Sequence, residues 1–318
     1  MTVLHSPFSG PKKAAFFWTA VLLAAVSAFA QNGGKTVVTS GRVNTMGKFS
    51  FQYGILEASV KIPKTADGLW PALWLLGGDY PEKSWPACGE IDILEMGHKD
   101  GIAGGIQDKL FNGAAHWGDQ LPDGSHPNYA VYRKNLYGLQ HGDFHLFTLV
   151  WDEHSIKMYL DRDKIPAGDQ PSGSSAPNPP PGGPVIPPGM KPYFEMAITP
   201  ELAPYFHKPF FIVINLAAGG TFTGIFSVEG ISALNKENSN RASLYVDYIR
   251  VYNKSGALIF NQDFDSSRLD TRLWNIEEND GGGGNRELQS YRRASVRVEK
   301  DRASGKSCLV LTARKENS

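Results

Sequence analysis

The chain has 318 residues, of which 41% are hydrophobic, and its 32 basic and 32 acidic residues give a formal net charge of zero. This length is compatible with one large β-domain, since β-sandwiches of about 200 to 250 residues commonly stay single. Zero net charge argues against nucleic acid or an anionic membrane surface as the partner, because both select basic proteins. A neutral polymer suits this charge balance better.

The N-terminus has the pattern of a secretory signal peptide. Two lysines precede an apolar run, Ala14 to Ala30, which ends in Ala-Phe-Ala. We therefore predict a signal peptide over residues 1–30, cleavage before Gln31, and a secreted or periplasmic protein that has no membrane attachment after cleavage. The alternative is an uncleaved membrane anchor, although the run is slightly short for a membrane span.

The rest of the chain alternates between strand-forming and turn-forming segments. No helical period of comparable length accompanies them, so we expect an all-β fold, a jelly-roll sandwich of two antiparallel sheets. Residues 165–192 are rich in Pro, Gly and Ser and are predicted to form a surface insertion, with an interdomain linker as the alternative. The segments rich in aromatic and β-branched residues are Phe49 to Ile62, Phe144 to Leu160, Phe210 to Leu216, Ser243 to Tyr252 and Cys308 to Ala313.

Three acids, Glu90, Asp92 and Glu95, lie within six residues of an otherwise apolar run. Alternation along a strand puts Glu90 and Asp92 on one face, and a β-bulge between Asp92 and Glu95 would return Glu95 to that face. Two glutamates held roughly 5 to 5.5 Å apart can act as the nucleophile and the general acid/base of a retaining glycosidase. Asp92 would orient one of them and keep their protonation states apart. An acidic, solvent-facing stripe on an edge strand is the alternative.

Two tryptophan-rich segments, Gly68 to Trp74 and Trp85 to Gly89, precede these acids. Together with the Glu-x-Asp-x-x-Glu motif they resemble glycoside hydrolase family 16, specifically its laminarinase-like branch. The resemblance implies a concave substrate cleft and an endo-acting, retaining hydrolysis of β-1,3-glucan or mixed-linkage β-glucan that requires no cofactor. It implies that Glu90 attacks the anomeric carbon, while Glu95 first protonates the departing oxygen and then activates water.

The resemblance also names substrate-binding candidates, each with core packing or a solvated surface position as its alternative. The two tryptophans should point into the cleft, and the histidine should hydrogen-bond the nucleophile or a sugar hydroxyl. The asparagine follows four glycines, which let the backbone approach a ligand closely. An aromatic residue at the cleft rim would stack on a distal sugar. The candidates are Trp70, Trp74, His116, Asn285 and Arg42, with Phe222 at the rim.

Two pairs of residues bear on stability rather than on catalysis. Asp247 and Asp263 are candidate ligands of a structural calcium ion, which the family often carries where the terminal strands meet. Asp263 replaces the usual glutamate, which shortens its reach. Cys88 and Cys308 are the only cysteines. We predict two buried free thiols, with a disulfide as the alternative.

The order of the segments departs from the pattern of the family. Residues 257–315 resemble its opening strands, yet they follow the segment Tyr245 to Tyr252, which normally closes the fold. We therefore predict one permuted domain over residues 31–318, in which residues 37–253 correspond to the later part. The turn-forming cluster Asn253 to Gly256 would join the two old terminal strands as a hairpin. A gene-model artefact is the alternative.

Other functions stay open at this point. A transglycosylase, an agarase-like hydrolase and a non-catalytic glucan-binding module all occur on the implied fold. Binding-only relatives should lack the acids, and all three acids are present here. Zero net charge and the absence of a basic cluster among the cleft candidates argue against sulfated galactans as substrates. We expect a monomer whose partner is a polysaccharide.

Overall fold

A computed structural model of the chain describes residues 36–123, 125–126, 128–135, 137–164, 183–280 and 284–317. The predicted signal peptide and residues 165–182 of the predicted insertion lie outside these ranges. Residues Thr36–Glu316 form one compact unit. No helix among the described residues has the length and apolar character needed to cross a membrane.

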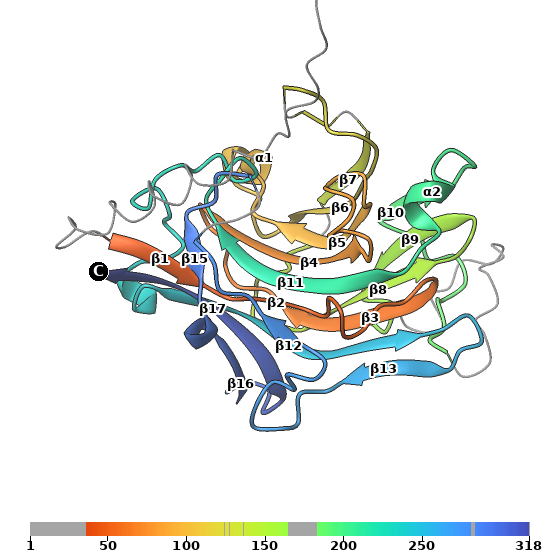
Figure 1. Ribbon diagram of the computed structural model, residues 1–318. Coiled ribbons are helices and arrows are strands. Elements are labelled where there is room, and N and C mark those ends of the chain that lie inside the picture. Colours follow the sequence, from red (N-terminus) through yellow and green to blue (C-terminus); the bar gives the residue numbers. More distant parts are fainter. Residues whose placement is uncertain are drawn as a thin grey trace, which may run out of the picture. The chain divides into compact units, whose positions relative to one another are not determined.

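Two β-sheets make up most of the regular structure of this unit (Figure 1). Neighbouring strands such as β3 and β12, or β4 and β11, run antiparallel, whereas β1 and β15 run parallel. Within the described residues, sheet A contains β10 (Phe194–Ala197), β9 (Ser155–Leu160), β8 (His145–Trp151), β3 (Gly54–Lys61), β12 (Arg241–Tyr252), β17 (Ser307–Asn317), β1 (Thr36–Ser40) and β15 (Gln289–Tyr291) in that order, with β13 (Leu258–Gln262) on β12 and β16 (Val296–Lys300) on β17. Sheet B contains β14 (Asn275–Ile276), β2 (Arg42–Asn44), β11 (Phe210–Ala218), β4 (Leu69–Gly77), β5 (Glu90–Met96), β6 (Leu110–His116) and β7 (Tyr129–Asn135) in that order. The predicted all-β fold of two mainly antiparallel sheets is confirmed.

Helices are short, as the lack of helical periodicity predicts. In the part of the chain that the structure describes, the α-helices are α1 (Lys99–Gly104), which joins β5 to β6, and α2 (Ala203–Phe206), which precedes β11. Single 3₁₀ turns cover Lys236–Asn238 and Arg293–Ser295.

Two of the predicted strand segments are divided differently in the structure. The segment Phe144 to Leu160 forms the hairpin of β8 and β9, because the Asp152 carboxylate accepts the backbone N–H groups of His154 and Ser155 and turns the chain. The other segment, Phe49 to Ile62, enters β3 only at Gly54, because the preceding residue, Tyr53, has a positive φ that ends extended pairing.

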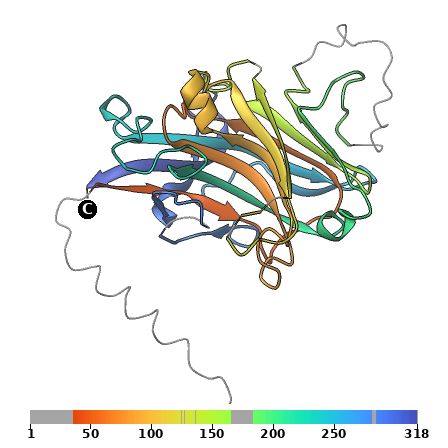
Figure 2. The same ribbon diagram turned by 90° about the horizontal axis from the view of Figure 1, so that it is seen from above.

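The hydrophobic core lies between the two sheets, where alternate residues of facing strands meet. Fully burying one aliphatic side chain contributes roughly 1.5 to 3 kcal/mol, so this layer is the main source of stability. Core residues from sheet A include Leu56, Ala58, Leu149 and Val246, and those from sheet B include Leu73, Leu75, Ile91 and Ile214. The opposite face of sheet B does not contact this core and can therefore carry polar side chains. The strands of sheet B are curved (Figure 2).

All nine residues of β11 are buried. Contact with the main core on one face of the strand would bury only alternate side chains. Phe211 and Val213 point away from the main core and pack with Leu76 and Cys88 in a second cluster. Trp74 and Trp85 lie against this cluster. The outer face of sheet B thus has its own apolar base beneath the indoles.

The last part of the chain contributes strands to both sheets. β14 joins sheet B, and β13, β15, β16 and β17 join sheet A. β12 pairs with β17 through Arg241–Val246 and with β13 through Ile249–Tyr252. The turn between β12 and β13 is closed by the Asn253 amide, which donates to the Ala257 carbonyl over 2.9 Å. The predicted hairpin is therefore confirmed, while the permutation itself stays a prediction.

The described end of the predicted insertion, residues 183–192, contains no strand. It does not lie wholly at the surface, however. Arg162 donates a hydrogen bond to the Val185 carbonyl, and the side chain of Ile186 is buried.

Candidate active site

The bulge predicted in the acidic segment is present in β5. Along β4, Leu73 pairs with Leu94 and the next residue, Trp74, pairs with Asp92, so β5 contains one extra residue, Ile93. The register of β5 with β6 also shifts, between Asp92 and Glu95. A one-residue bulge reverses the side-chain alternation beyond it. Asp92 and Glu95 therefore face the same side, together with Glu90.

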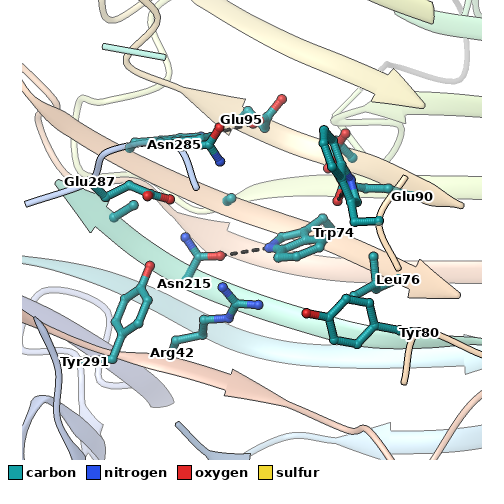
Figure 3. Close-up of a pocket in the computed structure, with 15 residues that line it drawn as sticks. Arg42, Trp74, Leu76, Tyr80, Glu90, Glu95, Asn215, Asn285, Glu287 and Tyr291 are labelled. Carbon is teal, nitrogen blue, oxygen red and sulfur yellow. Dashed lines mark hydrogen bonds between the residues drawn. The ribbon is translucent and has the colours of Figure 1, made fainter. Parts of the chain in front are cut away.

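The three acids line one open cavity on the outer face of sheet B (Figure 3). The empty space is about 790 Å³, including the open mouth. The floor comes from β4 and β11, one wall from β2 and the segment around β15, and the opposite end from the loop between β4 and β5. The other lining residues are Trp70, Ala72, Trp74, Leu76, Asn215 and Ala217 in the floor, Arg42, Asn285, Glu287 and Tyr291 in the wall, and Tyr80 and Trp85 at the opposite end.

Glu90 is held by an indole rather than by the predicted histidine. The Trp85 Nε1–H group donates to Glu90 Oε2 over 3.0 Å. His116 pairs with Glu90 in register, but its Nε2 lies 4.0 Å from Glu90 Oε1 and 3.4 Å from Asp92 Oδ2. A separation of 4.0 Å is too long for a hydrogen bond. The ring is turned toward Asp92, so His116 makes no hydrogen bond to Glu90 here, and the expected alternative, a hydrogen bond from His116 to a sugar hydroxyl, stays a prediction.

Glu95 has a separate set of partners. The Trp70 Nε1–H group donates to Glu95 Oε1 over 3.0 Å. The Trp70 ring stacks on Phe222 with 4.4 Å between ring centroids and 6° between planes, and Phe222 meets the edge of His98. Phe222 therefore packs against Trp70, which agrees with the packing alternative rather than with a free sugar platform.

Burial raises the pKa of all three carboxyl groups. The pKa of Glu90 rises to about 8, with the charge of Glu95 adding to the burial, although hydrogen bonds from Asp92 and Trp85 oppose the rise. The pKa of Asp92 is raised well above its usual range by burial and by both glutamates. The pKa of Glu95 rises to about 7, against bonds from Trp70 and Asn112. Hydrogen bonds alone therefore do not keep Glu90 ionised in the free cavity.

These pKa shifts affect which groups of the site carry a proton near neutral pH. A proton on Asp92 can be donated to Glu90, so the two residues share protons and titrate together. Burial lowers the pKa of His116 to about 4, so its imidazole is neutral near pH 7. The pKa values of Glu90 and Glu95 both lie near neutral pH, so one of the two can be ionised while the other is protonated. In the free cavity the higher pKa is that of Glu90, so a carboxylate nucleophile at Glu90 and a general acid at Glu95 require the proton to be on Glu95 once substrate is bound.

The remaining predicted binding residues mostly line the cavity. Trp74 donates its indole N–H to Asn215 Oδ1 over 2.8 Å (Figure 3). The Arg42 guanidinium lies 5.1 Å from the centre of the Trp74 ring and pairs with Glu277 at 3.0 Å. Asn285 is positioned through its backbone carbonyl, which accepts the Thr221 amide over 2.8 Å.

Several lining residues were not predicted from sequence. Asn215 had a signal, since it is a lone amide within an apolar strand segment. Trp85 begins one of the segments singled out in the sequence, but only the fold shows that Trp85 and Glu287 face the cavity. Tyr80 lies in a loop, and its position carried no pattern. Tyr291 ends β15, and only the fold shows that it faces the cavity.

One of the two predicted calcium ligands, Asp247, has other partners. Asp247 and Asp263 both line a shallow surface depression. The Asp247 carboxylate pairs with the Lys306 ammonium group and accepts the Ser59 hydroxyl over 3.2 Å. Calcium prefers oxygen ligands, so it would have to displace this ammonium group. The arrangement does not fit a calcium site as it stands, and the calcium prediction remains untested.

Both cysteines are buried free thiols, which confirms the prediction. Cys88 packs in the apolar cluster beneath Trp74 and Trp85, and Cys308 lies in β17 of the other sheet. Burial raises the pKa of each thiol to about 12.

Known proteins resemble this chain over part of its length. The model of the family described as glycosyl hydrolases family 16 matches residues 21–180. The chain is 32% identical over 219 residues to glucan endo-1,3-beta-glucosidase A1 of Niallia circulans, which covers 67% of this chain and 26% of that protein. It is 35% identical over 199 residues to a beta-1,3-glucan-binding protein of Penaeus monodon, which covers 62% of this chain and 50% of that protein. The chain thus spans half or less of the length of these two relatives.

Solved structures show the same likeness. A family 16 endo-glucanase from Bacteroides ovatus is 31% identical, with a TM-score of 0.52, and the match covers 70% of this chain and 83% of that one. A Bacteroides ovatus mixed-linkage glucan enzyme in complex with a product is equally similar, at 31% identity and a TM-score of 0.52.

Proposed function

Because the chain belongs to glycoside hydrolase family 16, we propose that it is an endo-acting β-glucanase that cleaves with retention of configuration. The observation that carries the proposal is the bulge in β5, which aims Glu90, Asp92 and Glu95 into one cavity lined by indoles and amides. Retaining enzymes need two carboxyl groups beside one sugar ring.

In the first step the Glu90 carboxylate attacks the anomeric carbon while the bond to the leaving oxygen breaks. Glu95 gives its proton to that oxygen, and a covalent glycosyl ester forms on Glu90. The Trp85 N–H group, 3.0 Å from Glu90 Oε2, orients the attacking carboxylate. The Trp70 N–H group orients Glu95 in the same way.

In the second step Glu95, now ionised, takes a proton from water. The resulting hydroxide attacks the anomeric carbon, and the Glu90 carboxylate leaves. Esterification has removed the negative charge of Glu90, which favours the ionised form of Glu95 at this stage. Two displacements restore the original configuration.

The proposed substrate is β-1,3-glucan of the laminarin type, with mixed-linkage β-glucan second. One relative is named for endo-1,3-beta-glucosidase activity and one similar structure for mixed-linkage glucan. A cavity whose floor is made of indoles, amides and small apolar residues suits uncharged sugars. The test is release of reducing sugar from laminarin, lichenan, agarose and carrageenan, with Glu90→Gln as the control. Turnover of laminarin and lichenan is expected, and turnover of a galactan alone would contradict the substrate.

The stereochemical outcome tests the mechanism separately. Proton NMR of early product should show the β-anomer first, followed by mutarotation. An α-anomer that appears first would indicate an inverting site and would remove the covalent intermediate on Glu90.

A second candidate function is glucan binding without turnover. It is favoured by the 35% identity to a beta-1,3-glucan-binding protein. The intact acids support the enzyme instead. Binding of laminarin with no reducing sugar released by the wild-type chain would reverse this preference. Product analysis at high acceptor concentration separates hydrolysis from transglycosylation.

The proposed location is the periplasm or the extracellular space. It rests on the sequence of residues 1–30, which lie outside the described structure. N-terminal sequencing of the protein recovered from culture medium or periplasm should begin at Gln31.

A further inference from the structure

We propose that Glu90, Asp92 and His116 form a binding site for Zn²⁺ inside the catalytic cavity, and that zinc bound there blocks catalysis reversibly. The binding itself is independent of the proposed function, whereas the blocking of catalysis rests on it. The site uses two strands: Glu90 and Asp92 project from β5, and His116 projects from β6 directly opposite Glu90.

The spacing of the ligand atoms suits a tetrahedral ion. One oxygen from each carboxylate and one nitrogen of His116 all lie within 4.8 Å of one another. Two ligands of a tetrahedral zinc ion, each about 2.1 Å from the metal, lie about 3.4 Å apart. His116 Nε2 is 3.4 Å from Asp92 Oδ2 and 4.0 Å from Glu90 Oε1. A small rotation of Glu90 is enough to complete the set.

Asp92 is the independent sign of an unfilled coordination position. The residue is only 3% exposed, and its Oδ2 atom is buried without a hydrogen-bond partner among the described residues. That oxygen points at His116 Nε2. A buried acceptor without a partner costs roughly 1 to 3 kcal/mol, so a cation between Asp92 and His116 would remove a standing penalty.

The donor set favours a borderline cation over a hard one. Calcium and magnesium prefer oxygen ligands alone, whereas zinc binds imidazole and carboxylate together. Three protein ligands leave a fourth position, which faces the cavity and can take water. His116 Nδ1 has no partner among the described residues, so the histidine lacks the outer hydrogen bond that usually strengthens a zinc ligand. We therefore expect binding in the micromolar range rather than tighter.

Zinc in this position would occupy the Glu90 carboxylate. The nucleophile could then no longer attack the anomeric carbon, and the sugar ring and the ion would compete for the same space. Inhibition should be competitive with substrate and reversed by a chelator.

The test is calorimetric titration of the full chain with Zn²⁺ in a buffer that does not bind metals. His116→Asn should weaken binding by about tenfold or more, since one of three ligands is lost. His154→Asn is the matched control, because His154 is exposed and remote from the cavity residues, and it should change neither zinc affinity nor activity. Calcium should not compete with zinc.

A second measurement does not depend on the folding of a variant. A saturating laminarin oligosaccharide should weaken zinc binding to the wild-type chain, and zinc should raise the KM for laminarin while leaving kcat unchanged. Equal zinc affinity in the wild type and His116→Asn, or zinc binding that oligosaccharide does not affect, would overturn the site. Zinc bound at His116 without inhibition would overturn its action on Glu90. If the chain hydrolyses no glucan, the titrations still decide the site.

Discussion

The residues up to Tyr252 and the residues from Leu258 onward contribute differently to the same cavity. The first part supplies the acids on β5 and both indoles that hold them, Trp70 and Trp85. The last part supplies most of one wall, through Asn285, Glu287 and Tyr291, beside Arg42 of the first part. In the proposed mechanism the first part carries the chemistry and the last part contributes to substrate binding, so we expect substitutions in the two parts to have different effects on activity.

The largest effect should come from removing the last part. A chain that ends at Asn253 loses β13 to β17, of which β14 belongs to sheet B and the others to sheet A. Exposed edges and a half-open core should make it aggregate. Solubility, cooperative unfolding and laminarinase activity are the measurements. A truncated chain that stays soluble, unfolds cooperatively and remains fully active would demote the last part to a dispensable tail.

Next in size are the acids of the first part. Glu90→Gln and Glu95→Gln should each lower kcat by about 10³-fold or more without unfolding the chain. An aryl glucoside with a good leaving group should partly rescue Glu95→Gln, because that leaving group needs no proton. It should not rescue Glu90→Gln. Wild-type activity in either variant, or equal rescue of both, would remove the assigned roles.

A smaller effect is expected from the wall. Asn285→Ala should raise the KM for laminarin by about tenfold with little change in kcat, because a uniform binding contact is lost. Asn261→Ala, on exposed β13, is the matched control and should change neither constant. A large drop in kcat for Asn285→Ala would mean that the last part takes part in the chemistry, and the comparison would break.

The acids of the first part should also make the folded protein less stable as the pH rises. Folding raises the pKa of Glu90 from near 4.5 to about 8, so the stability present below pH 4.5 is lost progressively as the pH rises to about 8. Glu90→Gln does not titrate, so its free energy of unfolding should exceed that of the wild type by more at pH 8 than at pH 4.5. Denaturant unfolding at pH 4.5 and pH 8 measures this gap. A gap that is the same at both pH values would contradict the raised pKa.

The smallest effect should come from changing only the order of the two parts. Moving residues 257–315 ahead of Val37 through a short flexible loop opens the β12–β13 turn but keeps every strand pairing. Loop-closure entropy changes slowly with loop length, so activity should survive with a modest shift in melting temperature. Loss of the fold in the reordered chain would argue against the permutation.

The sequence predicted the features that depend on near neighbours. The fold class followed from alternating segments, and the bulge followed from the odd spacing of Glu95 after Asp92, because side-chain direction along a strand is a local property. The hairpin at Asn253 to Gly256 followed from turn chemistry in the same way. The division of Phe144 to Leu160 into two strands was not predicted, although the polar residues Asp152 to Ser155 interrupt its apolar pattern where the Asp152 carboxylate turns the chain.

The partners of each acid were decided by tertiary structure. Nothing in the chain indicates that Trp85 rather than His116 bonds Glu90, since ring orientation depends on packing across two strands. The raised pKa values likewise come from burial in the assembled cavity, against which the local hydrogen bonds are too weak. Sequence by itself determined which residue types face one way along each strand. Only the packed sheets decided which of them meet, because contacts between distant segments depend on the register and curvature of the whole sheet.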